Sequence, residues 1–94
     1  MLILGLPILE AFKKNHAASR GALGAWQVSV EREKWETSHD IRRIYSTADF
    51  LADNRVIFNI KGNSFRLVVK VRYQNSLVVV EWVGTHADYD KKTF

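Results

Sequence analysis

The stretch "RVIFNIKGNSFRLVVKVRY", residues 55–73, decides the fold, because apolar and polar side chains alternate on both sides of a single turn. A two-residue turn at Gly62 and Asn63 predicts an antiparallel hairpin in which Asn59 pairs with Arg66. Since successive residues of a strand point to opposite faces, the hairpin has one apolar and one polar face. The apolar face holds Val56, Phe58, Ile60, Phe65, Leu67, Val69, Val71 and Tyr73, and the polar face holds Arg55, Asn59, Lys61, Arg66, Lys70 and Arg72.

Helical patterns precede this hairpin. Pro7 suits the first turn of a helix over residues 8–17, and a second amphipathic helix is predicted from Arg20 to Trp35. A capped helical turn over residues 37–45 is expected to deliver Ile41, Ile44 and Tyr45 to the core. Short strands are predicted at residues 1–4 and 48–52. The chain is too short for a second domain, so residues 1–94 are expected to form a single domain.

A final strand over residues 77–84 follows a predicted turn at Asn75 and Ser76. Counted without irregularity, this strand places Val80 and Trp82 on the apolar face, and Val79 and Val83 on the polar face. Glu81 then lies opposite Lys70, Thr85 lies opposite Arg66, and His86 emerges beside Arg66 and Asn59. The predicted fold is α+β, with two N-terminal helices packed on one face of a mainly antiparallel sheet and a short C-terminal helix.

Charge and composition restrict the partners. Lys and Arg number 14 against 10 Asp and Glu, for a formal charge of +4 and a pI near 9.6, which suits an anionic partner. Cysteine is absent, which excludes disulfides and cysteine-based zinc sites. The apolar start, "MLILGLPIL", is too short to span a bilayer and lacks the features of a signal peptide. We therefore expect a cytoplasmic protein without a membrane partner.

The polar face of the hairpin has two interpretations. A sheet packed on one side ordinarily leaves its other side solvated, which explains polar residues without any function. Five cations, Arg55, Lys61, Arg66, Lys70 and Arg72, nevertheless face a single anion, Glu81. Such an excess favours a surface that binds phosphate groups.

The C-terminal segment "GTHADYDKK", residues 84–92, also allows two interpretations. Thr85 and Asp88 have the spacing of a helix N-terminal cap. In the first interpretation the segment is simply the start of a helix, and His86 and Tyr89 have no function. The positive end of a helix and a neighbouring arginine both favour the neutral form of a histidine, and the neutral form is the one that can accept a proton. His16, His39 and His86 lie in different predicted elements without ligand spacing, so no metal site is predicted.

The runs "DNRVIFNIKGNSFRLVVKV" and "VEWVGTHADYDK", together with "ADFLADNR" before the hairpin, resemble the HigB family of type II toxin–antitoxin toxins. This resemblance implies a RelE-like fold and a ribosome-dependent endoribonuclease that cleaves mRNA without a metal or another cofactor. It also implies neutralisation by a HigA-type antitoxin with a helix-turn-helix domain. The family's polar segment after the first strand is replaced here by Gly5, Leu6 and Pro7, which leaves a ribosome contact by that segment open.

Carried over position by position, the family's basic and polar positions fall on Asn59, Lys61, Asn63, Arg66, Lys70, His86, Tyr89 and Lys91. Their expected roles follow from what metal-free RNA cleavage requires. His86 is expected to act as base or acid and Tyr89 to stack on a base or donate a proton, while Lys61, Arg66 and Lys70 stabilise the reacting phosphate. Which group is the base and which the acid stays open. RNA binding is expected from Arg55, Asn59, Asn63, Arg72, Lys91 and Lys92. The alternative is a non-catalytic basic module that binds RNA or the ribosome through charge and through Trp35, Tyr73 and Trp82.

Overall fold

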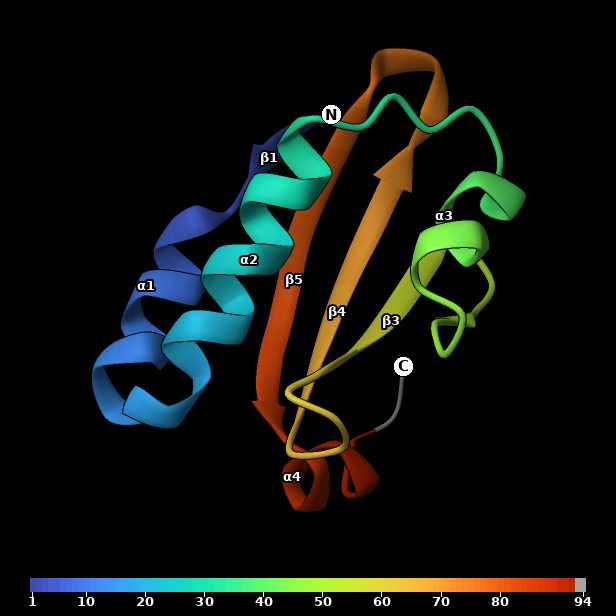
Figure 1. Ribbon diagram of the computed structural model, residues 1–94. Helices are drawn as coiled ribbons and strands as arrows, with labels where there is room; N and C mark the ends of the chain where they lie inside the picture. Colours follow the sequence, from blue (N-terminus) through green and yellow to red (C-terminus); the bar gives the residue numbers. More distant parts are fainter. Residues whose placement is uncertain (93–94) are drawn as a thin grey trace.

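The computed structural model describes residues 1–92, which form one mixed sheet with three helices against it and a short helix at the end of the last strand (Figure 1). The strands lie in the order β1-β5-β4-β3-β2; β1 is parallel to β5 and the other neighbours are antiparallel. The predicted α+β class is thus confirmed. The elements are β1 Leu2–Leu4, α1 Leu6–Asn15, η1 Ala17–Ser19, α2 Arg20–Glu31, α3 Ser38–Ile44, β2 Asp49–Phe50, β3 Arg55–Ile60, β4 Phe65–Arg72, η2 Tyr73–Asn75, β5 Leu77–Thr85 and α4 His86–Asp90.

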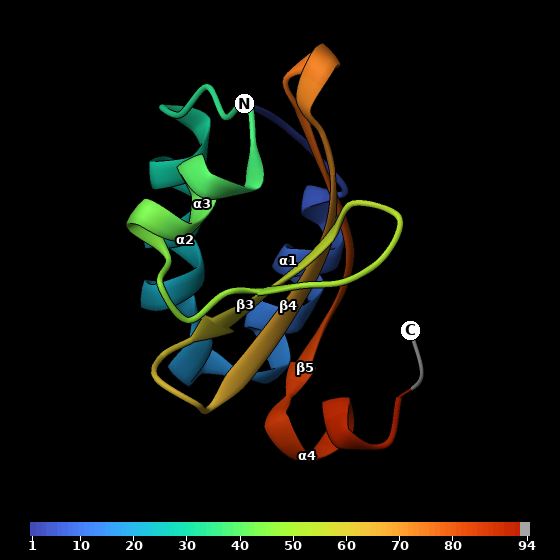
Figure 2. The same ribbon diagram turned by 90° about the vertical axis from the view of Figure 1, so that its right-hand side faces the viewer.

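One face of the sheet carries the main core. Figure 2 shows α2 and α3 on this side, whereas α4 lies on the other side beyond the end of β5. Helix α1 contributes the buried Leu9 to the same core. Phe58 lies at the centre of an aromatic cluster, with its ring centroid 5.5 Å from that of Trp26, 6.2 Å from that of Trp35 and 5.0 Å from that of Tyr45. The predicted stripe of α2, made of Leu23, Trp26 and Val30, is buried against this core.

The hairpin β3–β4 has the predicted register. Asn59 pairs with Arg66, and every other pair from Arg55–Lys70 to Ile60–Phe65 is also confirmed. The connection differs slightly, because the ladder ends at Ile60 and Phe65 and residues 61–64 form a four-residue loop. Lys61 and Gly62 both have positive φ angles in this loop, of 53° and 64°.

The register of β5 departs from the prediction in two places. At the start of the strand, residues 73–76 connect β4 to β5 in place of the predicted two-residue turn at Asn75 and Ser76, so Arg72 pairs with Leu77 and Lys70 does not lie opposite Glu81. The second departure is at Glu81. Val69 pairs with Val80 and Val68 pairs with Trp82, so Glu81 is an extra residue in a β-bulge. Beyond the bulge every side chain changes face, because strand side chains alternate with a period of two. The expected positions of Trp82 and Val83 were therefore wrong: Val83 is buried in the main core, and Trp82 lies on the opposite face. Lys70 pairs with Val79, and Arg66 pairs with Gly84.

The helix predictions need smaller corrections. Helix α2 ends at Glu31 and not at Trp35, because the chain turns there toward the N-terminus, whose amino group donates a hydrogen bond to the Val30 carbonyl oxygen at 3.3 Å. Trp35 is buried outside any helix. Ile44 was expected in the core but is 47% exposed.

Gly5 joins β1 to α1 in a way that no other residue allows. Its φ angle is 86°, and an added Cβ atom would lie 2.7 Å from the Val80 carbonyl oxygen. Pro7 follows in the first turn of α1, as predicted. The segment 5–7 therefore builds the strand-to-helix connection.

Candidate functional site

The centre of the candidate site is a contact between Arg66 on β4 and His86 at the start of α4. The Arg66 Nη2 atom lies 2.9 Å from the His86 Nε2 atom. The Nη1 atom lies 3.8 Å from the Asp49 carboxylate, and the guanidinium carbon lies 4.9 Å from the centroid of the Tyr89 ring. Only 17% of the Arg66 side chain is exposed, so these neighbours hold a cation in one place.

Local contacts fix the position of His86. The backbone N–H of His86 donates to the Ser64 carbonyl oxygen at 3.2 Å, which ties α4 to the β3–β4 loop. Thr85 caps the helix as predicted, because its Oγ1 atom accepts a hydrogen bond from the Asp88 N–H at 3.1 Å. On the other side of the ring, Nδ1 lies 3.3 Å from the Asp90 carboxylate.

These contacts select one form of the neutral imidazole. Arginine has only N–H donors, so the His86 Nε2 atom accepts from Arg66 and the ring proton is on Nδ1. That proton faces Asp90, which orients the ring. A ligand that draws Arg66 away therefore frees the Nε2 lone pair to accept a proton.

Asn59 and Arg66, which pair across the hairpin, each retain an unused hydrogen-bonding atom. The Asn59 Nδ2 atom donates to the Thr47 carbonyl oxygen at 3.1 Å. Its Oδ1 atom and the Arg66 Nε atom are buried and form no hydrogen bond with any side chain or backbone group of residues 1–92. Three other buried nitrogens, His16 Nδ1, Trp26 Nε1 and Trp35 Nε1, are also unpaired, so the two atoms do not by themselves indicate a ligand.

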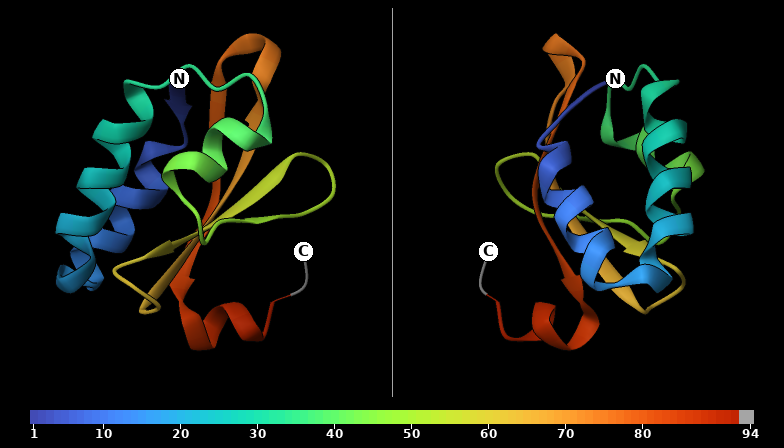
Figure 3. Two further views of the ribbon diagram at one scale, coloured as in Figure 1. Left: turned by 45° about the vertical axis from the view of Figure 1, so that its right-hand side comes forward. Right: turned by 90° about the vertical axis from the view of Figure 1, so that its left-hand side faces the viewer.

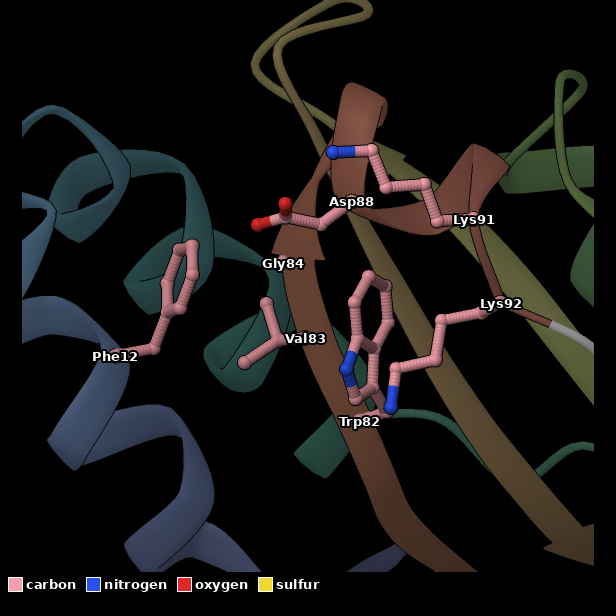
Figure 4. A pocket seen from close by; sticks show the side chains of 7 residues that line it. All are labelled: Phe12, Trp82, Val83, Gly84, Asp88, Lys91 and Lys92. Carbon is pink, nitrogen blue, oxygen red and sulfur yellow. The ribbon is translucent and has the colours of Figure 1, made fainter.

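A pocket of about 560 Å³ adjoins this centre between α1 and α4 (Figure 4). Figure 4 shows Phe12 facing Val83 and Asp88 across the pocket, with the Lys92 side chain beside the Trp82 ring. The Lys92 Nζ atom lies 5.5 Å from the Trp82 ring centroid, and the Trp82 and Tyr89 rings lie 6.1 Å apart. Aromatic rings next to lysines are typical of surfaces that bind single-stranded nucleic acid.

Comparison with known proteins identifies the family. The family model of the HigB toxins, described as the RelE-like toxic component of a toxin–antitoxin system, matches residues 19–92. The chain belongs to the HigB toxin family. A search of curated proteins found no match. The matched range contains the Arg66–His86 contact and its neighbours, and it omits β1 and α1, including the pocket residue Phe12.

The other predicted cations of this HigB-family toxin do not gather at the Arg66–His86 contact. Lys70 is four residues from Arg66 along β4, which places it about 13 Å away. Arg55 donates to the Glu81 carboxylate at 2.8 Å, and this hydrogen bond raises the pKa of the Arg55 guanidinium. Arg72 is at the far end of β4, while Lys61 and Asn63 are exposed in the β3–β4 loop. Lys91 and Lys92 line the pocket beside α4.

Sequence reasoning missed Asp49 and Asp90, which contact the central pair in the HigB-family toxin. Asp90 follows His86 by four residues, a spacing that places both on one side of a helix and was available in the sequence. Asp49 gave no such signal, because its contact depends on how β2 pairs with β3. Within residues 1–92, no three histidine or carboxylate side chains gather as a group that could hold a metal ion. The same residues contain no helix with the length and apolarity needed to cross a membrane.

Gly84 offers a test of the aromatic part of the site in the HigB-family toxin. An added Cβ atom would lie 2.4 Å from the Trp82 ring, so Gly84→Ala must displace the indole from beside Tyr89. Since a displacement of about 1 Å near reacting groups costs about 10²-fold in rate, we expect a loss of toxicity of about 10- to 10²-fold. Growth at graded inducer concentrations measures this loss. Gly21→Ala, where an added Cβ atom meets nothing within 4 Å, is the control; equal toxicity of both variants would separate Trp82 from the function.

Proposed function

We propose that this HigB-family toxin is an endoribonuclease that cleaves mRNA on the translating ribosome through the 2′-hydroxyl group. The observation that carries the proposal is the 2.9 Å contact between Arg66 and His86, next to Tyr89 and Asn59, at one end of a basic sheet face. It combines a phosphate-binding cation with a proton-accepting group at one point. Family membership supports a toxic role but does not specify the reaction.

The proposed reaction needs a base, an acid and a cation. The 2′-oxygen attacks the adjacent phosphorus and loses its proton, while the bond to the 5′-oxygen breaks and that oxygen gains a proton. The products are a 2′,3′-cyclic phosphate and a free 5′-hydroxyl. Arg66 stabilises the negative charge on the phosphorane through its guanidinium group.

His86 and Tyr89 are the proton-transferring groups that flank Arg66. When a phosphate oxygen takes the place of His86 on the Arg66 guanidinium, the Nε2 atom of His86 becomes free to accept the 2′ proton. Asp90 then holds the imidazole by its Nδ1–H. Tyr89 follows His86 by three residues on α4, and its ring centroid lies 4.9 Å from the Arg66 guanidinium carbon, where its hydroxyl can serve the leaving oxygen or its ring can stack on a base.

The remaining cations fit the RNA backbone better than they fit the reacting phosphate. Lys70 and Arg72 lie about 13 and 20 Å from Arg66 along β4. At these distances they can contact other phosphates of the RNA backbone but not the phosphate that Arg66 binds. We therefore move Lys70 from the group that stabilises the reacting phosphate to the group that positions RNA, which also contains Arg55, Asn63, Arg72, Lys91 and Lys92. Lys61, in the loop that contacts His86 through Ser64, stays a candidate for the reacting phosphate.

The proposed setting is the cytoplasm, where ribosomes translate mRNA. Family membership implies an antitoxin partner, and we propose the HigA type with a helix-turn-helix domain.

The test is induced expression followed by mapping of mRNA 5′ ends. Wild-type protein should create new ends within translated regions. Arg66→Ala should lower cleavage by about 10²- to 10³-fold, the usual effect of removing one group that stabilises transition-state charge. His86→Ala should lower it by about 10²- to 10⁴-fold, as for a general acid or base.

Two controls make this test specific. Arg32→Ala removes an exposed arginine from the end of α2, far along the chain from the site, and should leave cleavage unchanged. Thermal melting of each variant shows whether it folds, because Arg66 is largely buried. Full toxicity of both Arg66→Ala and His86→Ala would show that the site is elsewhere. Growth arrest by a ribosome-bound protein without new 5′ ends would favour the non-catalytic binding module.

A further inference from the structure

Four apolar side chains form an exposed surface at the other end of the sheet from α4. Leu2 and Leu4 of β1 are 61% and 45% exposed, the two largest exposures for large apolar side chains at that sheet edge. They pair with the partly buried Leu77 and Val79 of β5, while Ile3 and Val78 between them point into the core. The side chains of Leu2, Leu4, Leu77 and Val79 therefore share one face, which we call the β1 patch.

The β1 patch has a basic border. Leu77 pairs with Arg72 and Val79 pairs with Lys70, so both cations lie beside the patch on the sheet face opposite the helices. Neither cation forms an ion pair with an acidic group of residues 1–92. Figure 3 shows β1 and α4 near opposite ends of β5, so the patch is separate from the Arg66–His86 contact.

This combination fits a protein partner better than RNA. Leucine and valine side chains offer nothing to a phosphate or to the edge of a base, whereas an apolar centre with a charged border is the usual composition of a protein interface. Clustered exposed apolar side chains are uncommon on a surface that faces only water. The border of Lys70 and Arg72 favours a partner segment that carries carboxylates.

We propose that the β1 patch docks the antitoxin, through a segment whose apolar side chains cover Leu2 and Leu4 and whose acidic side chains meet Lys70 and Arg72. The proposal rests on membership in a toxin–antitoxin family and on the charge of the border, and not on the cleavage mechanism. The patch and the candidate site lie on the same sheet face. An antitoxin docked on the patch thus blocks the approach of a ribosome without contacting Arg66 or His86.

The experiment measures antitoxin affinity and toxicity separately. The antitoxin is the product of the flanking reading frame that restores growth when both are expressed. Leu2→Asp and Leu4→Asp place a carboxylate where the acidic segment should lie, and we expect antitoxin affinity to fall at least about 30-fold, as for loss of a central interface anchor. Val28→Asp, on the exposed side of α2 at 48% exposure, is the control and should bind normally.

The expected result is a patch variant that inhibits growth like wild type and is no longer rescued by the antitoxin. Unchanged antitoxin affinity in both patch variants would overturn the proposal. If affinity is unchanged while ribosome binding or self-association is lost, the patch contacts the ribosome or a second copy and the proposal also fails. If an Asp variant does not fold, Leu4→Gln is measured in its place, because it makes the patch polar without adding a charge. Antitoxin affinity is measured without RNA, so this test does not depend on cleavage. If wild-type protein binds the antitoxin but does not cleave mRNA, the proposed function is refuted and the docking proposal is not.

Discussion

Purified protein is expected to cleave mRNA on programmed ribosomes at least about 10⁵-fold faster than the same mRNA free in solution. Holding two reacting groups in line is equivalent to about 7–11 kcal/mol of the barrier, or effective molarities of about 10⁵–10⁸ M. In free RNA the 2′-oxygen is rarely in line with the adjacent phosphorus. The ribosome can hold the mRNA backbone in that geometry.

The composition of the site explains why such help is needed. His86 is the only imidazole in contact with Arg66 among residues 1–92, and one positioned acid or base contributes about 10²–10⁴ in rate. In the proposed mechanism, the contribution expected of Arg66 is a further factor of about 10²–10³, from stabilising charge. Together these terms fall short of an efficient ribonuclease unless the substrate is already oriented.

The assay incubates one labelled mRNA with the protein, with and without programmed ribosomes. EDTA is added to the ribosome-free arm, so that a contaminating metal-dependent nuclease cannot contribute. His86→Ala is run in both arms to show that any product comes from the proposed site. Efficient cleavage of free RNA by wild type, lost in His86→Ala, would place the protein among free ribonucleases and contradict ribosome dependence.

Phe58→Ala is expected to lower the free energy of unfolding by about 3–5 kcal/mol, the usual cost of truncating a buried phenylalanine. Phe58 is 1% exposed and contacts the rings of Trp26, Trp35 and Tyr45, so its removal leaves a cavity where α2, the segment after it and α3 meet the sheet. Small domains have only about 5–15 kcal/mol of stability in total. A large part of the population is then expected to be unfolded at growth temperature and to lose its toxicity.

Urea unfolding followed by tryptophan fluorescence measures this change. Val28→Ala, an apolar truncation at a 48% exposed position, is the matched control and should shift stability by less than about 0.5 kcal/mol. A Phe58→Ala variant as stable as wild type would show that the aromatic cluster does not hold the helices on the sheet.

The fold was predictable where local pattern decides it. Alternation and a glycine-containing turn were enough to place Asn59 opposite Arg66, because a slip by one residue would expose the whole apolar face. The end of α2 and the exposure of Ile44 were not predictable, since they depend on contacts with the N-terminus and on how α3 lies against the sheet.

The candidate site was predictable only in part, for the same reason. Arg66 and His86 were expected to meet, and they do, although His86 approaches through the Ser64 contact and not through a pair between Arg66 and Thr85. Trp82 was assigned to the core because nothing in the residue pattern announces the bulge at Glu81. Whether the assembled residues catalyse cleavage stays a prediction.

The bulge at Glu81 has a consequence for sequence alignment and for engineering. Deletion of Glu81 would restore plain alternation in β5, so Trp82 and Gly84 would turn toward the helices and Val83 would turn outward. Substitution at position 81 changes one exposed side chain and its contact with Arg55, whereas a change of length there rearranges both layers of the protein at once. We therefore expect relatives with the same candidate-site residues to vary in residue type at this position and to conserve the spacing between the apolar start of β5 and the histidine of α4.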